Sequence, residues 1–432
     1  MAFLGLVLAS ALGLALVTVS CGMTDSRLAT IWTDVPEIAL YAELFNRGQD
    51  RYRVEVIWKA GLARELKDTK APPDLVIGNY LRSALVRDRF RSLEYLFGEL
   101  TVDQTAFYPG LLALGVESGQ QLTLPLSFNL PTIFFLKEGE ARPADARTIG
   151  LDELSRLALA YDRGQGSSYT RIGFSPRWDP NFLVLAVNVA GASFREGKPL
   201  DWSEPGLRLA LDRLRSWGGP TAALPTVADD FQFKYLFTPP YTYVAEGRAL
   251  FAYQSSSDFF LIPEGKSAAL DFRWFSESRD IHLLEDIVFA GLPRSSRDQQ
   301  AAEAFLGWLF KPSNQQAMLE SSRRTRALES SFGIAGGFSS LREVTENVFP
   351  LYYAALKDRV PPAEEIGSPD PLPREWPTLK ADVIGPWLRD VLAREAGTAS
   401  APPAKPPLKA AELGAELAGK ITDYLRSGQG SR

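Results

Sequence analysis

Gln121-Leu-Thr-Leu-Pro-Leu-Ser-Phe-Asn-Leu-Pro-Thr-Ile-Phe-Phe-Leu-Lys137 contains two extended apolar runs, each interrupted by a proline. Proline removes a backbone N–H and clashes with the preceding helical turn, so neither run fits a helix interior. The stretch therefore predicts a strand, a crossover and a second strand. Because α/β units are expected on both sides of it, we interpret it as the passage between two lobes, with a cleft beside it.

The residues before this crossover predict one α/β unit that begins near Leu28. Strands are expected at 28–32, 53–58 and 73–78, and Asp34-Val-Pro-Glu37 has the spacing of a capping box at the start of a helix. This alternation favours a parallel sheet covered by helices, whose sites lie at the carboxyl ends of the strands. The side chains expected at those ends are Trp32, Asp34, Asn79 and Tyr80.

Length and composition limit the classes of protein to consider. A chain of 432 residues exceeds what one hydrophobic core usually organises, which favours two lobes. The net charge of −5, with signs interspersed, argues against a nucleic-acid partner. With one cysteine and one histidine, His282, the chain offers no disulfide, no Ser-His-Asp or Cys-His apparatus and no histidine-based metal cluster. No cofactor is expected.

The single cysteine, Cys21, follows Phe3–Ser20, an almost uninterrupted apolar run. This position predicts a signal peptide over 1–20 and a lipobox whose cysteine is lipidated, with 21–27 as the linker. Two features depart from the usual pattern: Thr18 stands at −3, and no Lys or Arg precedes the run. An uncleaved membrane anchor or ordinary secretion are the alternatives. All three predict an exported protein, periplasmic or on the cell surface.

The order of several motifs resembles the family 1 extracellular solute-binding proteins of ABC importers, the group that includes maltose-binding protein. The motifs are the Trp32 strand end, Pro73–Gly78, Leu124-Pro125, Trp178-Asp-Pro, Gly247–Phe251 and Gly291-Leu-Pro followed by Ala304–Gln316. The resemblance implies an α/β clamp of type II, with two mainly parallel sheets covered by helices and a hinge of crossing segments. It also implies a monomer without enzymatic activity that delivers a small polar solute, most readily a carbohydrate, to ABC permease transmembrane subunits.

The resemblance and the segment pattern together suggest a division of the mature chain. The expected parts are lobe 1 over 28–125 with a return over 285–330, lobe 2 over 126–284, helices mainly on lobe 2 over 331–396, an Ala/Pro linker over 397–407, and a C-terminal helix and tail over 408–432.

Cleft aromatics would stack on the apolar faces of a sugar, while carboxylates and amides accept its hydroxyl protons. We assign Trp217, Trp308 and Trp387 to packing because they lie in apolar helical stretches. The expected ligand-binding residues are Trp32, Asp34, Asn79, Tyr80, Asn129, Trp178, Asp179, Tyr253, Ser255, Asp258, Trp274 and Trp376.

Two departures from the family pattern leave the ligand open. Leu136 stands where asparagine commonly precedes the lysine of the second crossover strand, and the loop over 294–298 is short. A polyamine, a glycerophosphodiester or another small polar solute is the alternative to a carbohydrate. Two other functions also remain: a surface lipoprotein that uses the scaffold for sensing or adhesion, and a secreted glycoside hydrolase with two carboxylates.

Overall fold

The computed structural model describes the chain over the ranges 27–99, 102–140, 142–165, 168–198, 200–215, 217, 225–277, 280–296, 299–395 and 410–427. The predictions for the signal peptide over 1–20, for the linker with Cys21 and for the Ala/Pro segment over 397–407 lie outside these described residues.

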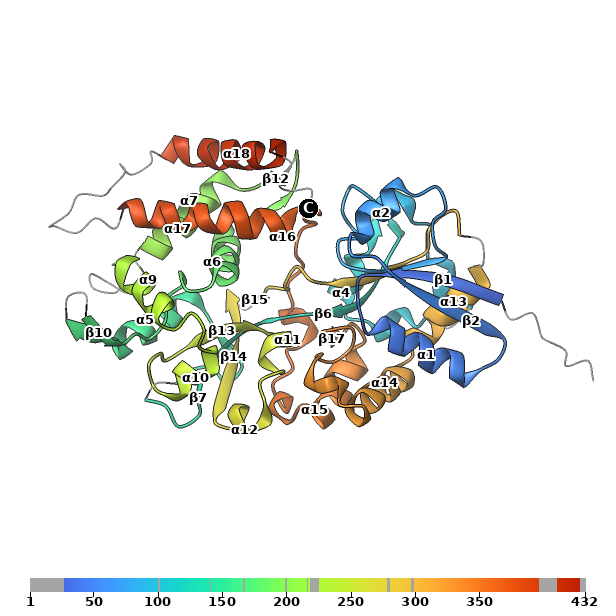
Figure 1. Cartoon of the computed structure of the whole chain (residues 1–432), viewed down its shortest axis with the longest axis horizontal. Coiled ribbons are helices and arrows are strands. Elements are labelled where there is room, and N and C mark those ends of the chain that lie inside the picture. Colours follow the sequence, from blue (N-terminus) through green and yellow to red (C-terminus); the bar gives the residue numbers. More distant parts are fainter. Residues whose placement is uncertain are drawn as a thin grey trace, which may run out of the picture.

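The first lobe is built on a six-stranded sheet with the order β17-β6-β16-β3-β1-β2 (Figure 1). Its strands are β1 (Arg27–Thr33), β2 (Tyr52–Trp58), β3 (Leu75–Gly78), β6 (Leu124–Phe128), β16 (Val288–Gly291) and β17 (Phe338–Ser339). The three strands predicted from the N-terminal part of the chain are confirmed. The sheet is completed by segments that follow much later in the sequence.

The second lobe is built on a five-stranded sheet with the path β13-β7-β14-β15, and β8 pairs with β14. Its strands are β7 (Pro131–Leu136), β8 (Thr148–Ile149), β13 (Ala252–Ser255), β14 (Leu270–Glu277) and β15 (Asp280–Ile281). Short hairpins lie outside both sheets: β4 (Val116–Glu117) with β5 (Gln120–Gln121), β9 (Arg163–Gln165) with β10 (Ser168–Arg171), and β11 (Arg195–Glu196) with β12 (Leu200–Asp201).

Strand directions differ from the expectation of two mainly parallel sheets. In the first sheet β1 runs parallel to β2 and β3, but β16 is antiparallel to β3 and β6, and β17 is antiparallel to β6. In the second sheet only the β8–β14 pairing is parallel. The reason is that the chain passes directly between lobes, so strands enter the sheets from the partner lobe rather than through helical crossovers.

The predicted crossover is confirmed by β6 and β7, which lie in different sheets and are separated by only Asn129 and Leu130. Leu130 is fully buried, and both strands are almost completely buried. A second crossing joins β15 to β16, and a third follows β17 and leads to α16 (Trp376–Leu379). These three passages form the base that joins the lobes.

Helices cover both sheets (Figure 1). Around the first sheet lie α1 (Ile38–Gly48), α2 (Leu62–Asp68), α3 (Tyr95–Glu99), α4 (Pro109–Ala113), α13 (Gln299–Leu309), α14 (Pro312–Arg324) and α15 (Phe349–Tyr352). With the second sheet lie α5 (Leu151–Tyr161), α6 (Pro180–Val187), α7 (Glu204–Arg215), α9 (Pro225–Lys234), α10 (Pro240–Ala245), α11 (Ser256–Phe259), α12 (Glu264–Ser267), α17 (Gly385–Glu395) and α18 (Ala410–Arg426).

The chain after 331 is shared between the lobes. β17 pairs with β6 in the first sheet, whereas α16 and α17 contribute Trp376, Leu388 and Val391 to the buried cluster of the second lobe. The range 331–396 therefore does not lie mainly on one lobe. The predicted amphipathic C-terminal helix is α18, which buries Leu413, Leu417 and Ile421 in the same cluster.

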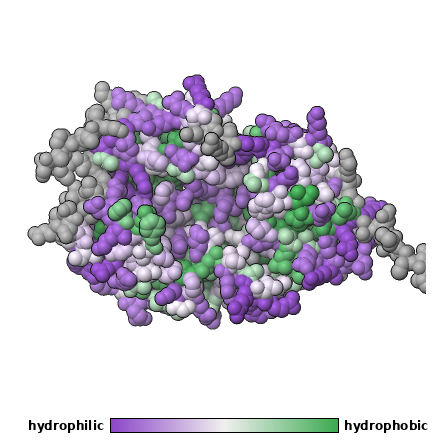
Figure 2. Space-filling model, in the orientation of Figure 1, coloured by the Kyte–Doolittle hydropathy of each residue, from purple (hydrophilic) through white to green (hydrophobic). Residues whose placement is uncertain are grey.

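On the face that Figure 2 shows, hydrophilic side chains predominate, with smaller apolar patches between them. Within the described part of the chain, no helix combines the length and the apolar character that a membrane span requires.

Candidate functional site

A cavity of about 400 Å3 lies where the two lobes meet. The first lobe contributes Tyr80, which follows β3. The second lobe and two crossing segments contribute the rest of the wall: residues 282–286 between β15 and β16, and Pro369 and Leu372 before α16. The polar and aromatic lining residues include Tyr80, Asp179, Asn181, Asn188, Tyr253, Gln254, Ser255, Asp258, His282, Glu285, Asp286, Trp376 and Lys380.

The carboxyl end of β3 lies at this junction, and its last residue, Gly78, is closely packed against neighbouring side chains. A Cβ on Gly78 would lie 2.2 Å from Asp34 Oδ1 and 2.3 Å from Leu62 Cδ2, so only glycine fits there. Asn79 donates from its amide nitrogen to the carbonyl oxygens of Asp286 (3.1 Å) and Ile287 (3.2 Å). Asn79 thus ties the first lobe to the second crossing, and Tyr80, with φ of 59°, turns into the cavity.

The expected capping box at Asp34 does not form. Helix α1 begins at Ile38 with Glu37 as its N-cap, and no side chain caps it. Asp34 instead lies against Gly78, and its Oδ1 is buried without a hydrogen-bond partner among the described residues. Burial raises the pKa of Asp34 to about 6. Asp34 does not line the cavity, so its predicted contact with the ligand stays a prediction.

Asn129 occupies the first crossing and joins three segments. Its Nδ2 donates to Asp286 Oδ2 (2.8 Å) and to the carbonyl oxygen of Gly336 (3.0 Å), and its Oδ1 accepts from Ser256 Oγ (2.7 Å). These bonds use both N–H groups of the amide, and Asn129 is not among the lining residues. In this structure Asn129 holds the hinge and positions Asp286.

Two residues of the second-lobe wall are placed by the N-termini of helices. Asp179 caps α6, accepting from the backbone amides of Asn181 (2.7 Å) and Phe182 (3.2 Å), and burial raises its pKa. Ser255 caps α11 by accepting from the amide of Asp258 (3.1 Å), and its hydroxyl donates to Asp258 Oδ2 (2.7 Å). The structure therefore brings Asp179, Ser255 and Asp258 together in one wall, with Tyr253 beside them.

Trp376 lines the cavity beside two charged residues that the sequence analysis missed. Its Nε1 donates to Glu285 Oε1 (3.2 Å), and the same oxygen forms an ion pair with Lys380 Nζ. His282 also lines the cavity, and burial lowers its pKa. The signal that could have identified Glu285 and Asp286 is their position just before the β16 strand, at a crossing between lobes.

Trp178 lies in a second, aromatic cavity of about 190 Å3 that shares Asp179, Pro240 and Tyr253 with the first. Its ring stacks on Phe231 with centroids 4.4 Å apart, and its Nε1 donates to the carbonyl oxygen of Ala228 (3.1 Å). The structure therefore places Trp178 next to the main cavity rather than in its wall.

Two predicted tryptophans lie away from the cavity. Trp274 is wrong as a ligand contact, because it is fully buried among Phe260, Phe272 and Phe338, and its Nε1 donates to the carbonyl oxygen of Arg359. Trp32 is partly buried, and the ammonium of Lys59 lies 4.4 Å from the centre of its ring. A strand end seen in the sequence does not reveal which sheet face a side chain occupies.

Glu196, on the β11–β12 hairpin of the second lobe, bridges to the first lobe. Its carboxylate oxygens accept from the amide of Ala84 (2.8 and 3.0 Å), and Arg87 Nη1 lies 3.4 Å from Oε2. The backbone amide of Glu196 donates to Pro371. Glu196 therefore links the lobes outside the crossing segments.

Replacing Glu196 by alanine is expected to raise the ratio of open to closed molecules in the ligand-free protein by about tenfold. The reason is that charge-assisted hydrogen bonds between the lobes are lost. Small-angle X-ray scattering would detect a larger radius of gyration. Glu43→Ala, which removes an ion pair within α1, is the matched control. An unchanged radius for Glu196→Ala would contradict this role.

Among the residues that the structure describes, no group of three or more His, Cys, Asp or Glu side chains is arranged to hold a metal ion.

The sequence matches no protein-family model and no curated protein. Solved structures do match. The sugar-binding protein MalE from Xanthomonas citri superimposes with a TM-score of 0.64 at 13% identity, over 93% of this chain and 98% of that one. The cyclic α-maltosyl-1,6-maltose binding protein from Arthrobacter globiformis gives 0.59 at 17% identity, over 93% and 100%.

A third similar structure is the maltose/maltodextrin-binding domain MalE from Bdellovibrio bacteriovorus bound to maltotriose, with a TM-score of 0.51 at 16% identity over 92% and 100% of the two chains. These neighbours are binding proteins rather than enzymes. At such identities the likeness establishes the fold, which is the two-lobed α/β clamp of type II.

Proposed function

We propose that the protein is an extracytoplasmic solute-binding component of an ABC import system that captures a carbohydrate between its lobes. The observation that carries the proposal is the cavity of about 400 Å3 at the lobe junction, lined by carboxylates, amides and aromatic rings. This combination suits a sugar, whose hydroxyls donate to carboxylates and whose apolar faces stack on rings. Mannotriose and maltotriose are bound by structural neighbours.

The clamp supplies a mechanism for capture. A solute that contacts Tyr80 on the first lobe and the Asp179 and Ser255 region on the second is bound by both lobes only when they are close. Closure is then a population shift whose size equals the difference in binding free energy between the two states. Asn129 and Asn79, which hold the crossing segments, would keep the motion a rotation about the base.

Delivery to permease transmembrane subunits and anchoring through lipidated Cys21 are part of the same proposal. They rest on the apolar run before Cys21 and on the resemblance to importer components. Radiolabelled palmitate incorporation, compared between the full chain and Cys21→Ala, tests the anchor. Absence of label from both proteins would contradict it.

A thermal-shift screen of mono- and oligosaccharides tests the binding function. A bound sugar raises the melting temperature by mass action, with about 2.7 kcal/mol of stabilisation at a hundredfold excess over Kd. The sugar should be recovered intact, because binding without turnover separates this function from a glycoside hydrolase. A screen without any stabilising solute would favour sensing or adhesion by the scaffold.

Replacing Tyr80 by alanine is expected to weaken the affinity for the solute by about tenfold, because the first lobe loses its main contact with the cavity. Isothermal titration calorimetry with the sugar found in the screen measures the change. Tyr95→Ala, at an exposed position on α3, is the control. An unchanged affinity for Tyr80→Ala would place the solute elsewhere.

A further inference from the structure

Two residues that line the main cavity have buried oxygen atoms without a hydrogen-bond partner among the described residues. They are Asp286 Oδ1 and Gln254 Oε1. Both atoms are acceptors, and buried polar atoms are normally satisfied by the protein, by water or by a ligand. The solute is therefore expected to bring hydrogen-bond donors to this part of the cavity.

The charges around the cavity are unbalanced. Four carboxylates line it, on Asp179, Asp258, Glu285 and Asp286, against one ammonium, on Lys380. Lys380 is already ion-paired with Glu285. Burial lowers the pKa of His282, which therefore adds no positive charge at neutral pH. Lys380 also acts on Asp179, where its charge opposes the effect of burial on the pKa of that carboxyl. Asp258 and Asp286 remain without a cation in the described wall of the cavity.

Arg389 is another cation to consider, since its charge acts on Asp179. It does not line the cavity, however, and its Nη2 donates to the carbonyl oxygens of Arg177 (2.5 Å) and Trp178 (3.4 Å) and to Gln232 Oε1 (2.9 Å). Its guanidinium is thus held by acceptors of the second lobe, and Asp286 is not one of them.

Among these four carboxylates, Asp286 is the one with a buried oxygen that has no partner among the described residues. The residue is half-buried, and Asn129 Nδ2 donates to Oδ2, so that Oδ1 is left for a ligand. A neutral hydroxyl would satisfy Oδ1 but would leave a buried charge uncompensated. A protonated amine supplies both the hydrogen bond and the opposite charge.

We propose that the solute carries a positively charged nitrogen that donates to Asp286, so that an amine-bearing sugar is preferred over its neutral counterpart. The inference deepens the proposed function and rests on the cavity being the solute site. Because Asp286 lies on the β15–β16 crossing and is bonded to the β6–β7 crossing through Asn129, a cation there also acts directly on the hinge.

Isothermal titration calorimetry with four probes tests the proposal: cellobiose, the β-1,4-linked glucosamine dimer, N,N′-diacetylchitobiose and spermidine. The glucosamine dimer is expected to bind at least about tenfold more tightly than cellobiose, which has no nitrogen, and than N,N′-diacetylchitobiose, whose nitrogens are uncharged amides. This preference should fall as NaCl concentration rises. Asp286→Asn should remove the preference while retaining binding of the dimer, whereas Asp152→Asn, on an exposed surface, should keep it.

The wild-type comparison alone can overturn the inference, even if Asp286→Asn does not fold. Equal or tighter binding of cellobiose would refute the charged nitrogen and leave the carbohydrate function intact. Binding of spermidine alone would support the charged nitrogen and refute the carbohydrate. Absence of binding by all four probes would count against both.

Discussion

Replacing Trp274 by alanine is expected to lower the free energy of unfolding by about 3–5 kcal/mol, the range for a large aromatic ring removed from a packed core. The ring is fully buried, with centroids 4.8 Å from Phe272 and 5.8 Å from Phe338, and its Nε1 donates to the carbonyl oxygen of Arg359 (2.7 Å). The substitution removes the packing and leaves that carbonyl without its donor. Urea denaturation followed by circular dichroism measures the loss.

Two variants make this result interpretable. Trp58→Ala removes the same side chain from an edge strand where it is 54% exposed, and it should cost less than about 1 kcal/mol. Trp274→Phe keeps most of the packing and should lie between the two. A loss below about 1 kcal/mol for Trp274→Ala would show that the ring is not part of the core.

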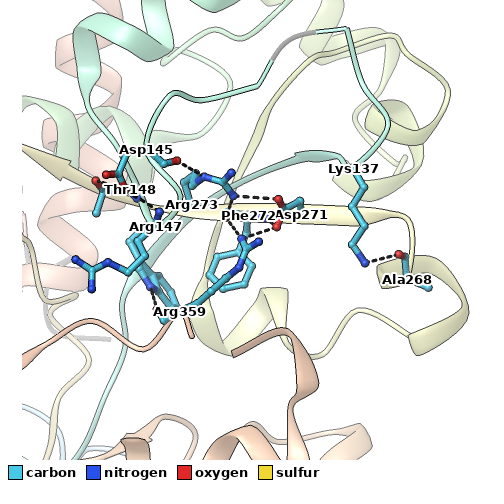
Figure 3. A network of polar contacts seen from close by, with 10 residues as sticks. Lys137, Asp145, Arg147, Thr148, Ala268, Asp271, Phe272, Arg273 and Arg359 are labelled. Carbon is cyan, nitrogen blue, oxygen red and sulfur yellow. Dashed lines mark hydrogen bonds and ion pairs between the residues drawn. The ribbon is translucent and has the colours of Figure 1, made fainter. Parts of the chain in front are cut away.

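Replacing Asp271 by alanine is expected to lower the free energy of unfolding by about 3 kcal/mol, because Arg273 on β14 and Arg359 on the third crossing lose their shared partner. Asp271 Oδ2 lies 3.0 Å from Arg273 Nη1, and Oδ1 lies 2.5 Å from Arg359 Nη1 (Figure 3). Both guanidinium groups also donate to the carbonyl oxygen of Phe272, and Arg273 is buried. Without the carboxylate two cations face each other in a largely buried site.

The contribution of Asp271 depends on pH in a defined direction. Burial alone would raise its pKa, but the hydrogen bonds and charges of Arg273 and Arg359 outweigh burial and lower it below 3.8. A lowered folded-state pKa means that the stabilisation is complete above 3.8 and is lost as pH falls through the folded value.

The difference in unfolding free energy between the wild type and Asp271→Asn should therefore be constant at neutral pH and shrink in strong acid. Asp152→Ala breaks an ion pair with Arg213 whose carboxylate is 89% exposed, and it should cost at most about 1 kcal/mol. Equal losses for Asp152→Ala and Asp271→Ala would contradict a special role for the shared carboxylate.

Local sequence rules predicted the elements of the fold well where one physical cause dominated. Prolines at 125 and 131 exclude a helix, and the apolar residues around them specify buried strands, so β6 and β7 could be located. Strand direction could not be predicted, because β16, which lies between β3 and β6 in the sheet, follows β6 by about 160 residues in the sequence. Pairing over that distance leaves no local pattern.

Part of the candidate site was also predictable, because local sequence patterns determine it. Asp179 and Ser255 begin helices, and helix starts can be recognised from the sequence. Glu285, Asp286 and Lys380 meet only after the lobes are assembled. The position of Glu285 and Asp286 just before a strand is a weak signal for a site, and it does not indicate that Lys380 lies beside them. Trp274 shows the converse error, since its strand is obvious but the face it occupies depends on the position of Phe338 in another strand.

The place of β16 has a consequence for biosynthesis. Strands β3 and β6 are made early but do not pair with each other in the sheet. Each pairs with β16, which is translated only after all five strands of the second sheet. While the ribosome is still adding those residues, the N-terminal half of the chain holds two unfinished sheet edges. The first sheet can therefore close only after this late strand has been added.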